Sequence, residues 1–277
     1  MKHFAIIAAI ALLASACCDK DVCRKSVQGD EFTPSGNWKL EWVDDFNGRR
    51  MDPATWNQTK RRVYQTLSKD LAATKGGALY IWAREVREDD GTEGVNGYTA
   101  GDVDSKGKKY FNLGKDGVHG RLDIRAKMSG AEGFWPAIWM EPDNYPYDGE
   151  IDIMEHLNYK DFTYHTIHTV ESIENPRRPH AMQRTAAVNF EDWNIYSVEG
   201  DSTGLRMYIN DVEVATYTKE EFSEDRYPFD TCEYFLLLSN QISGVWVGRD
   251  YPGKILPSGV GMPCYIAIDF VRYYTAQ

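Results

Sequence analysis

The stretch Gly-Glu-Ile-Asp-Ile-Met-Glu-His at residues 149–156 restricts the fold of this chain more than any other feature. Acidic and apolar residues alternate along it, and this period of two predicts a β-strand with one acidic face and one core face. In a regular strand Glu155 would point to the core, because it lies five residues after Glu150. One extra residue at 153–154, a β-bulge, would return Glu155 to the acidic face beside Asp152. We therefore expect a bulged strand that presents three carboxyl groups together.

Three carboxylates on one strand face repel one another, so a sheet gains no stability from them. A pair of carboxyl groups about 5 to 5.5 Å apart is what a retaining glycosidase uses as nucleophile and proton donor. An isolated pattern of this kind is also typical of a solvated acidic strand or a cation site. Here the segment Gly-Phe-Trp-Pro-Ala-Ile-Trp-Met at residues 133–140 precedes it and brings Trp135 and Trp139 close to the acids. Because the apolar C–H faces of sugars dock on flat aromatic rings, the combination indicates a saccharide site.

These two segments together closely resemble the signature of glycoside hydrolase family 16, and in particular its laminarinase-like branch, which carries the bulged E-x-D-x-x-E form. The resemblance extends from about Trp38 to Tyr274. It implies an all-β fold, a concanavalin A-like jelly-roll sandwich of two curved antiparallel sheets with a concave substrate cleft. Short strand-like runs at 78–84, 98–105 and 120–128, separated by turn residues and without a sustained helical period, favour the same sandwich.

The resemblance also implies a mechanism, a double displacement that retains the configuration of the sugar. Glu150 is expected to attack the anomeric carbon and Glu155 to act as acid and then base. Asp152, between them, is expected to hold Glu150 and to keep Glu155 protonated through its charge. Sugar contacts are expected from five further side chains: Trp135, Trp139, His168, Gln241 and Trp246.

No cofactor is needed for this chemistry. Many members of the family carry a structural calcium ion on the convex side of the sandwich, and Asp45 and Asp269 match that region. A structural calcium ion is therefore a further expectation of the resemblance.

Three departures from the branch leave the substrate open. The segment 61–74 is shorter than usual, Thr169 stands where many glucanases of the branch carry an aromatic residue, and the loop at 239–243 is unusual. The main hypothesis is an endo-β-glycosidase that hydrolyses β-1,3- or mixed β-1,3/1,4-glucan. The alternative is an endo-β-galactosidase acting on galactan or mucin-type O-glycan chains. A carbohydrate-binding protein on the same sandwich is the non-enzymatic alternative, which the presence of all three acids opposes.

The formal net charge of −11 argues against nucleic acid and against anionic lipid surfaces as partners. The expected partner is a poly- or oligosaccharide, and we expect a monomer. After removal of a leader, about 255 residues remain, enough for one large β domain.

The N-terminal residues predict export. Residues 1–17 read as a lipoprotein signal peptide, with an apolar run too short for a transmembrane helix and the lipobox-like sequence Ala-Ser-Ala-Cys ending at Cys17. Residues 18–36 are then a linker and residues 37–277 the catalytic domain. We expect Cys17 to be lipidated and this anchor to be the protein's one contact with a membrane. The expected location is the outer membrane or surface of a Gram-negative bacterium, with a periplasmic or secreted protein as the alternative.

Overall fold

The computed structural model describes residues 32–58, 66–67, 71–85, 98–170, 172, 182–222, 227–242, 246–247 and 263–277. The chain forms two compact units, Met1–Phe32 and Thr33–Gln277, and the elements below belong to the second. The predicted signal peptide with Cys17 and most of the predicted linker lie outside the described residues.

The second unit begins at Thr33, whereas the sequence places the start of the domain at residue 37. A hydrogen bond explains the difference, because the backbone N–H of Ser35 donates to Asp211 at 2.9 Å. Residues 33–36 are thus part of the domain and not of the linker.

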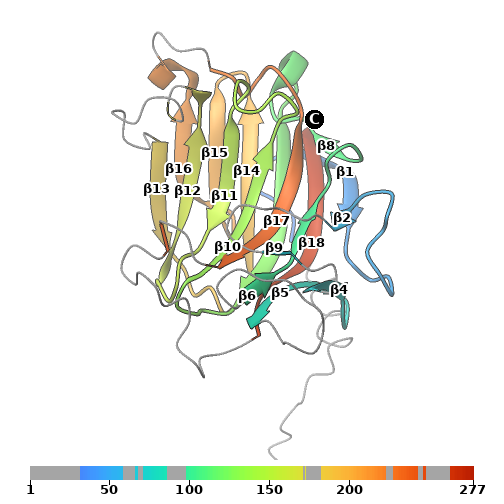
Figure 1. The fold of residues 1–277 in the computed structure, drawn as a ribbon. Helices are drawn as coiled ribbons and strands as arrows, with labels where there is room; N and C mark the ends of the chain where they lie inside the picture. The colour runs from blue at the N-terminus through green and yellow to red at the C-terminus, as the bar shows by residue number, and fades with distance from the viewer. Residues whose placement is uncertain are drawn as a thin grey trace, which may run out of the picture. The chain divides into compact units, whose positions relative to one another are not determined.

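Two β-sheets make up this unit (Figure 1). In the described residues, the eight-stranded sheet has the order β13-β12-β11-β10-β17-β7-β2, with β8 paired to β17. Its strands are β2 (Asn57–Gln58), β7 (Asp102–Asp104), β8 (Tyr110–Phe111), β10 (Phe134–Glu141), β11 (Glu150–Glu155), β12 (Phe162–His168), β13 (Met182–Ala187) and β17 (Tyr234–Ile242).

The ten-stranded sheet has the order β16-β15-β14-β9-β18-β5-β6-β3, with β1 paired to β18 and β4 to β5. Its strands are β1 (Trp38–Asp44), β3 (Thr66–Leu67), β4 (Ala72–Thr74), β5 (Leu79–Glu85), β6 (Tyr98–Ala100), β9 (Gly120–Met128), β14 (Asn194–Asp201), β15 (Gly204–Ile209), β16 (Val212–Thr218) and β18 (Cys264–Ala276). Two short 3-10 helices, η2 (Lys115–Gly117) and η3 (Lys219–Phe222), lie between strands.

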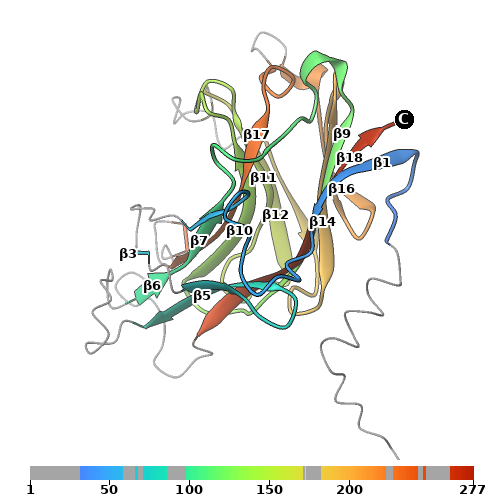
Figure 2. The ribbon, with the colours of Figure 1, turned by 90° about the vertical axis from the view of Figure 1, so that its right-hand side faces the viewer.

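The core lies between the two sheets, which Figure 2 shows as separate layers, β10, β11 and β12 in one and β9, β14 and β18 in the other. Alternation decides which side chains enter it: Leu122 and Ile124 of β9 and Ile151 and Ile153 of β11 are fully buried and belong to one core cluster. The predicted all-β jelly-roll sandwich is confirmed. Among the described pairs only β3 with β6 is parallel.

The run predicted at 98–105 is not one strand. It divides at Gly101 into β6 of the ten-stranded sheet and β7 of the eight-stranded sheet. A Cβ atom at Gly101 would lie 2.5 Å from the carbonyl oxygen of Leu71, so the chain can cross between the sheets there only with glycine.

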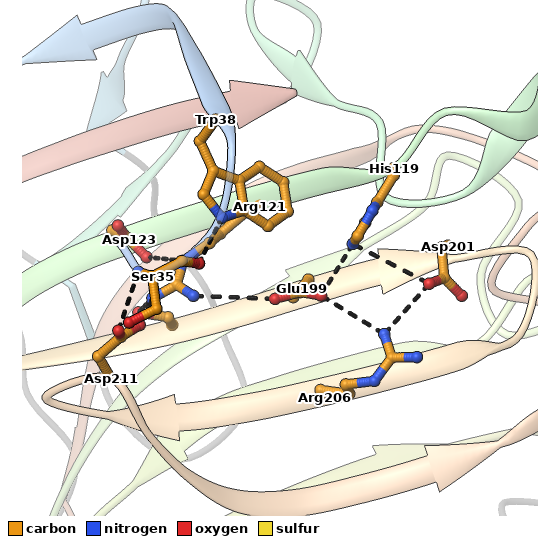
Figure 3. Close-up of polar contacts among 10 residues, drawn as sticks. Ser35, Trp38, His119, Arg121, Asp123, Glu199, Asp201, Arg206 and Asp211 are labelled. Carbon is orange, nitrogen blue, oxygen red and sulfur yellow. Dashed lines mark hydrogen bonds and ion pairs between the residues drawn. The ribbon is translucent and has the colours of Figure 1, made fainter. Parts of the chain in front are cut away.

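A buried ion network covers part of the outer face of the ten-stranded sheet (Figure 3). Arg121 on β9 is only 1% exposed, and it donates to Asp123 and to Asp211 at 2.8 Å each. Asp211, in the turn after β15, also accepts the N–H of Ser35. The network therefore holds the start of the domain on the side of the sandwich that faces away from β11.

In the part of the chain that the structure describes, no helix has the length and apolar character needed to cross a bilayer.

Candidate active site

The predicted bulge in β11 is confirmed by the strand register. Toward β10 the pairing passes from Met154 directly to Asp152, which leaves Ile153 without a partner. Toward β12 the two residues between Asp152 and Glu155 stand opposite a single residue. Ile153 and Met154 both point into the core and are fully buried. Glu150, Asp152 and Glu155 therefore share the outer face of the eight-stranded sheet.

Glu155 is more enclosed than Glu150, with 6% of its surface exposed. The indole N–H of Trp135 donates to its Oε1 at 3.0 Å. Burial, followed by the charges of Asp152 and Glu150, raises the pKa of Glu155 well above its usual range. The hydrogen bonds from Trp135 and Thr166 oppose this rise without cancelling it. The arrangement favours the protonated form of Glu155.

Glu150 opens β11 and lies opposite His168 of β12. Burial, with the charge of Asp152, raises the pKa of Glu150 to about 8. The positive charge of His168 and a hydrogen bond from Tyr145 act in the opposite direction. Glu150 thus has a cation and a phenol beside it, whereas Glu155 has neutral donors.

His168 and Asp152 form an ion pair, with 3.2 Å between Nε2 and Oδ2. Burial by itself lowers the pKa of His168, but the hydrogen bond to Asp152 and the charges of Asp152 and Glu150 raise it above its usual value. A protonated His168 balances one negative charge of the site, which makes it possible to hold several carboxyl groups there.

Gly149 sets the entry of the chain into this strand. Its φ of 81° is in the region that favours glycine. A Cβ atom there would lie 2.7 Å from the ring of Phe229 and 3.0 Å from the carbonyl oxygen of His168. The backbone of the site is therefore packed too closely for any other residue at this position.

Two of the predicted sugar contacts, Trp135 and Trp246, lie together. Their ring centroids are 4.9 Å apart in an edge-to-face arrangement, and Trp246 is also 4.8 Å from Tyr164. Both tryptophans are only partly buried. Because Trp135 also contacts Glu155, this aromatic cluster adjoins the acids and offers apolar surface to a sugar.

Trp139 and Gln241 lie on the same face but differ in what they can contact. Trp139 is 9% exposed, packs against Phe235 and Leu237, and donates from Nε1 to Ser239 at 3.0 Å. Its ring packs against the sheet beside Asp152, and the contact of Trp139 with a sugar stays a prediction. Gln241 stands opposite Trp135 in the register of β10 and β17, and is half-buried.

Three side chains of the site were not predicted from the sequence: Tyr145, Tyr164 and Thr166. Tyr164 and Thr166 could have been found, because they alternate with His168 along β12 and so share its face. Tyr145 had no such signal, since it lies in the loop between β10 and β11, which follows no strand period.

The residues expected to bind calcium have other partners. Asp269 accepts a hydrogen bond from Arg125 at 2.9 Å, and Asp45 accepts from the backbone and side chain of Asn47. In the described residues, the one set of three or more His, Cys, Asp and Glu with ligand atoms close enough for a metal is Glu150, Asp152 and His168. The cation beside Asp269 makes it a poor calcium ligand, and structural calcium stays a prediction.

The raised pKa of Glu155 predicts a pH-dependent effect of Glu155→Gln on stability. A carboxyl group whose pKa is higher in the folded state contributes stability below its unfolded pKa near 4.5 and loses it as the pH rises toward the folded value. Glutamine does not titrate, so the Tm of the variant minus that of the wild type should grow between pH 5 and pH 8. Thermal unfolding at both pH values measures this. The exposed Glu213 of β16 gives the control Glu213→Gln. If the difference in Tm between Glu155→Gln and the wild type were the same at both pH values, the raised pKa of Glu155 would be contradicted.

The chain is similar to known proteins in sequence and in structure. The family model "XgeA-like, catalytic GH16 domain" matches residues 121–220, from β9 to beyond β16, and so includes the three acids. The match covers 100 of the 277 residues, and it supports the glycoside hydrolase class that the sequence predicts.

Relatives and solved structures extend the likeness over most of the chain. A keratan-sulfate endo-1,4-beta-galactosidase of Sphingobacterium multivorum is 30% identical over 86% of this chain and 55% of its own length. A beta-glucanase of Rhodothermus marinus is 26% identical over 88% of each chain. The X-ray structure of the laminarinase from Rhodothermus marinus has a TM-score of 0.72 at 27% identity and covers 87% of this chain and 98% of that one. The chain thus spans only about half of the first relative but nearly all of the other two.

Proposed function

We propose that this chain is a retaining endo-β-glycosidase of glycoside hydrolase family 16 that hydrolyses internal β-1,3 or mixed β-1,3/1,4 linkages of a glucan. The observation that carries the proposal is the bulge of β11, since it puts Glu150, Asp152 and Glu155 on one face of the sheet beside Trp135. Two carboxyl groups about 5 to 5.5 Å apart, one on each side of the scissile glycosidic bond, are what a double displacement needs.

In the proposed mechanism, Glu150 attacks the anomeric carbon while Glu155 donates its proton to the leaving oxygen. Water then hydrolyses the glycosyl-enzyme with Glu155 as base, and the configuration is retained. The surroundings of the two glutamates support this division. His168 and Tyr145 stabilise a negative charge on Glu150, so it is the first of the two to ionise, and the proton remains on the more enclosed Glu155.

Asp152 connects the two halves of the mechanism. Its charge raises the pKa of both glutamates, and its ion pair with His168 keeps it in place between them. When Glu150 becomes an ester, one negative charge of the site is lost, so Glu155 can ionise more easily and act as base. This shift between the two steps is the property that a residue acting first as acid and then as base requires.

Replacing His168 by glutamine tests this electrostatic account. The histidine lowers the pKa of Glu150, so a neutral side chain should let that pKa rise further. Since Glu150 must be ionised to attack, the acidic limb of the kcat/KM profile should move to higher pH. His119→Gln is a matched control, because His119 pairs with Glu199 on the ten-stranded sheet. An unmoved or lowered acidic limb in His168→Gln would rule out this role.

The choice of glucan follows the beta-glucanase and the laminarinase, because the chain spans 88% and 98% of their lengths but only 55% of that of the galactosidase. A second candidate, an endo-β-galactosidase on galactan or mucin-type glycans, is favoured by the 30% identity to the keratan-sulfate endo-1,4-beta-galactosidase and by Thr169 in place of an aromatic residue. Trp135, Trp246 and Tyr164 offer stacking surface to either sugar and do not decide between them.

Product analysis on a panel of substrates separates the two candidates. The panel contains laminarin, mixed-linkage glucan, agarose, keratan-type chains and mucin glycans. We expect a ladder of gluco-oligosaccharides from laminarin or mixed-linkage glucan, with retained β-configuration by NMR at early times. Products from the galactose-containing chains alone would replace the glucan proposal by the second candidate. Binding to the panel without any product would support the carbohydrate-binding alternative instead.

We also propose that the mature protein is a lipoprotein of a Gram-negative outer membrane or cell surface, anchored at Cys17. The support is the sequence Ala-Ser-Ala-Cys after a short apolar run. Palmitate labelling should depend on Cys17, and Cys17→Ala should release the protein from the membrane fraction. A wild-type protein found in the soluble fraction would contradict the anchor.

A further inference from the structure

We propose that His165 is a positioning residue for the reaction: its ring holds the bulge of β11, and through it Glu155, by a hydrogen bond to the carbonyl oxygen of Ile153. The inference rests on the proposed role of Glu155 as acid and base. His165 itself does not touch the sugar-facing side of the sheet, since its neighbours Tyr164 and Thr166 take that side and it points into the core.

The bulge creates the need for such a residue. Ile153 is skipped in the register toward β10, and toward β12 it shares a single opposite residue with Met154. Its carbonyl group is enclosed between the sheets, where an unpaired acceptor costs about 1–3 kcal/mol. The structure supplies a donor, because Nδ1 of His165 lies 2.7 Å from the oxygen of Ile153. His165 is the residue of β12 that faces the extra residue of β11.

The ring of His165 is held in one tautomer. It is fully buried, and burial lowers its pKa to about 4, so the ring is neutral at the pH of most assays. A neutral ring that donates from Nδ1 accepts at Nε2, and the hydroxyl of Thr163 lies 3.0 Å from that nitrogen. The backbone carbonyl of His165 accepts a further hydrogen bond from Tyr217 of the other sheet at 2.6 Å. The ring is therefore held at both nitrogens, and the backbone of His165 is held by a third hydrogen bond.

The consequence falls on Glu155, two residues after Ile153. The peptide groups of the bulge decide whether this carboxyl group points toward Trp135 and the sugar or turns aside. A misplacement of about 1 Å in a catalytic group can cost on the order of 100-fold in rate. Holding one carbonyl group of the bulge thus helps to hold the acid of the proposed reaction.

Two amide substitutions distinguish the effect of the hydrogen-bond donor at Nδ1 from the effect of losing the imidazole ring. The side-chain amide of asparagine lies where Nδ1 lies, and that of glutamine lies where Nε2 lies, so only His165→Asn keeps a donor for Ile153. We expect the kcat of His165→Asn to stay within about threefold of the wild type. His165→Gln should lose roughly 10- to 100-fold in kcat with little change in KM. Tyr217→Phe is the control, because it removes a buried hydrogen bond to the same residue without touching the bulge.

Two readouts connect the loss to Glu155. An aryl glycoside whose leaving group needs no protonation makes the acid unnecessary in the first step. Azide as acceptor in place of water makes the base unnecessary in the second step. With both, the loss of kcat in His165→Gln relative to the wild type should become smaller. Carbon-13 NMR of the Glu155 carboxyl group needs no substrate: its titration should be unchanged in His165→Asn and displaced in His165→Gln. The second readout stays valid if the proposed function fails on the substrate panel.

Equal kcat and equal Glu155 titration in the two amide variants would overturn the proposal. So would a loss in Tyr217→Phe as large as that in His165→Gln, since general destabilisation would then explain both. If His165→Gln does not fold, the substitution is repeated in a variant from which Ile153, and with it the carbonyl group, has been deleted. This double variant should fold, because no acceptor is left without its donor. If the double variant also fails to fold, the proposal is overturned.

Discussion

Replacing Glu150 by glutamine is expected to lower kcat by roughly 10⁶-fold, the scale on which the loss of a nucleophile acts in a serine protease. Glutamine has the shape of glutamate, and Glu150 lies at the start of β11 where the backbone pairing with His168 does not depend on its charge. The fold should therefore persist, with a circular dichroism spectrum like that of the wild type and a Tm no lower than that of the wild type, because burial also raises the pKa of Glu150. Turnover of the best substrate of the panel measures the effect.

The identity of the nucleophile is tested by rescue. Glu150→Ala leaves space at the anomeric carbon, so azide or formate should restore turnover and give a product of inverted configuration. Glu213→Gln is the control, because the exposed Glu213 of β16 lies on the other sheet and receives the same change of charge. We expect it to stay within a few-fold of the wild type. Rescue with retained configuration, or a dead control, would assign the role of Glu150 wrongly.

The parts of the fold that follow a period of two were predictable from the sequence. The run 120–128 became β9 with its expected bounds, and Leu122 and Ile124 entered the core. The spacing of Glu150 and Glu155 predicted the bulge, because an odd separation puts two residues on opposite faces of a regular strand. Local patterns of this kind depend only on residues that are close in the chain.

The remaining features depend on contacts that no local pattern contains. Gly101 passes the chain between the sheets because of a carbonyl group at Leu71, and Tyr145 reaches Glu150 from an irregular loop. His165 reads in the sequence as a core-facing residue of an alternating strand. Its hydrogen bond to Ile153 becomes visible only with the register of the two strands. The packing of Trp139 with Phe235 and Leu237 likewise becomes visible only with the register of β10 and β17.

Removing the bulge should leave an active enzyme. With Ile153 deleted, the strand reads Glu-Ile-Asp-Met-Glu, and a regular strand of this spacing also puts both glutamates on one face. The register favours the deletion of Ile153 over that of Met154, since Met154 keeps its partner Ile138. Losing a fully buried isoleucine costs about 2–5 kcal/mol, so a lower Tm is expected together with measurable kcat.

Adding a residue beside Met154 should be far more damaging than removing one, and the contrast tests the whole account of the site. One further residue would turn Glu155 from the outer face into the core, where an unpaired carboxylate is costly and where it can no longer reach the sugar. We expect no turnover and a large loss of stability, whereas the same insertion in the exposed turn between β14 and β15 should be tolerated. Activity is measured on the same substrate for all three variants, and folding by circular dichroism. The account is wrong if the insertion variant is active while the deletion variant folds but is inactive. The direction of Glu155 would then not decide catalysis, and another group would have to supply the proton.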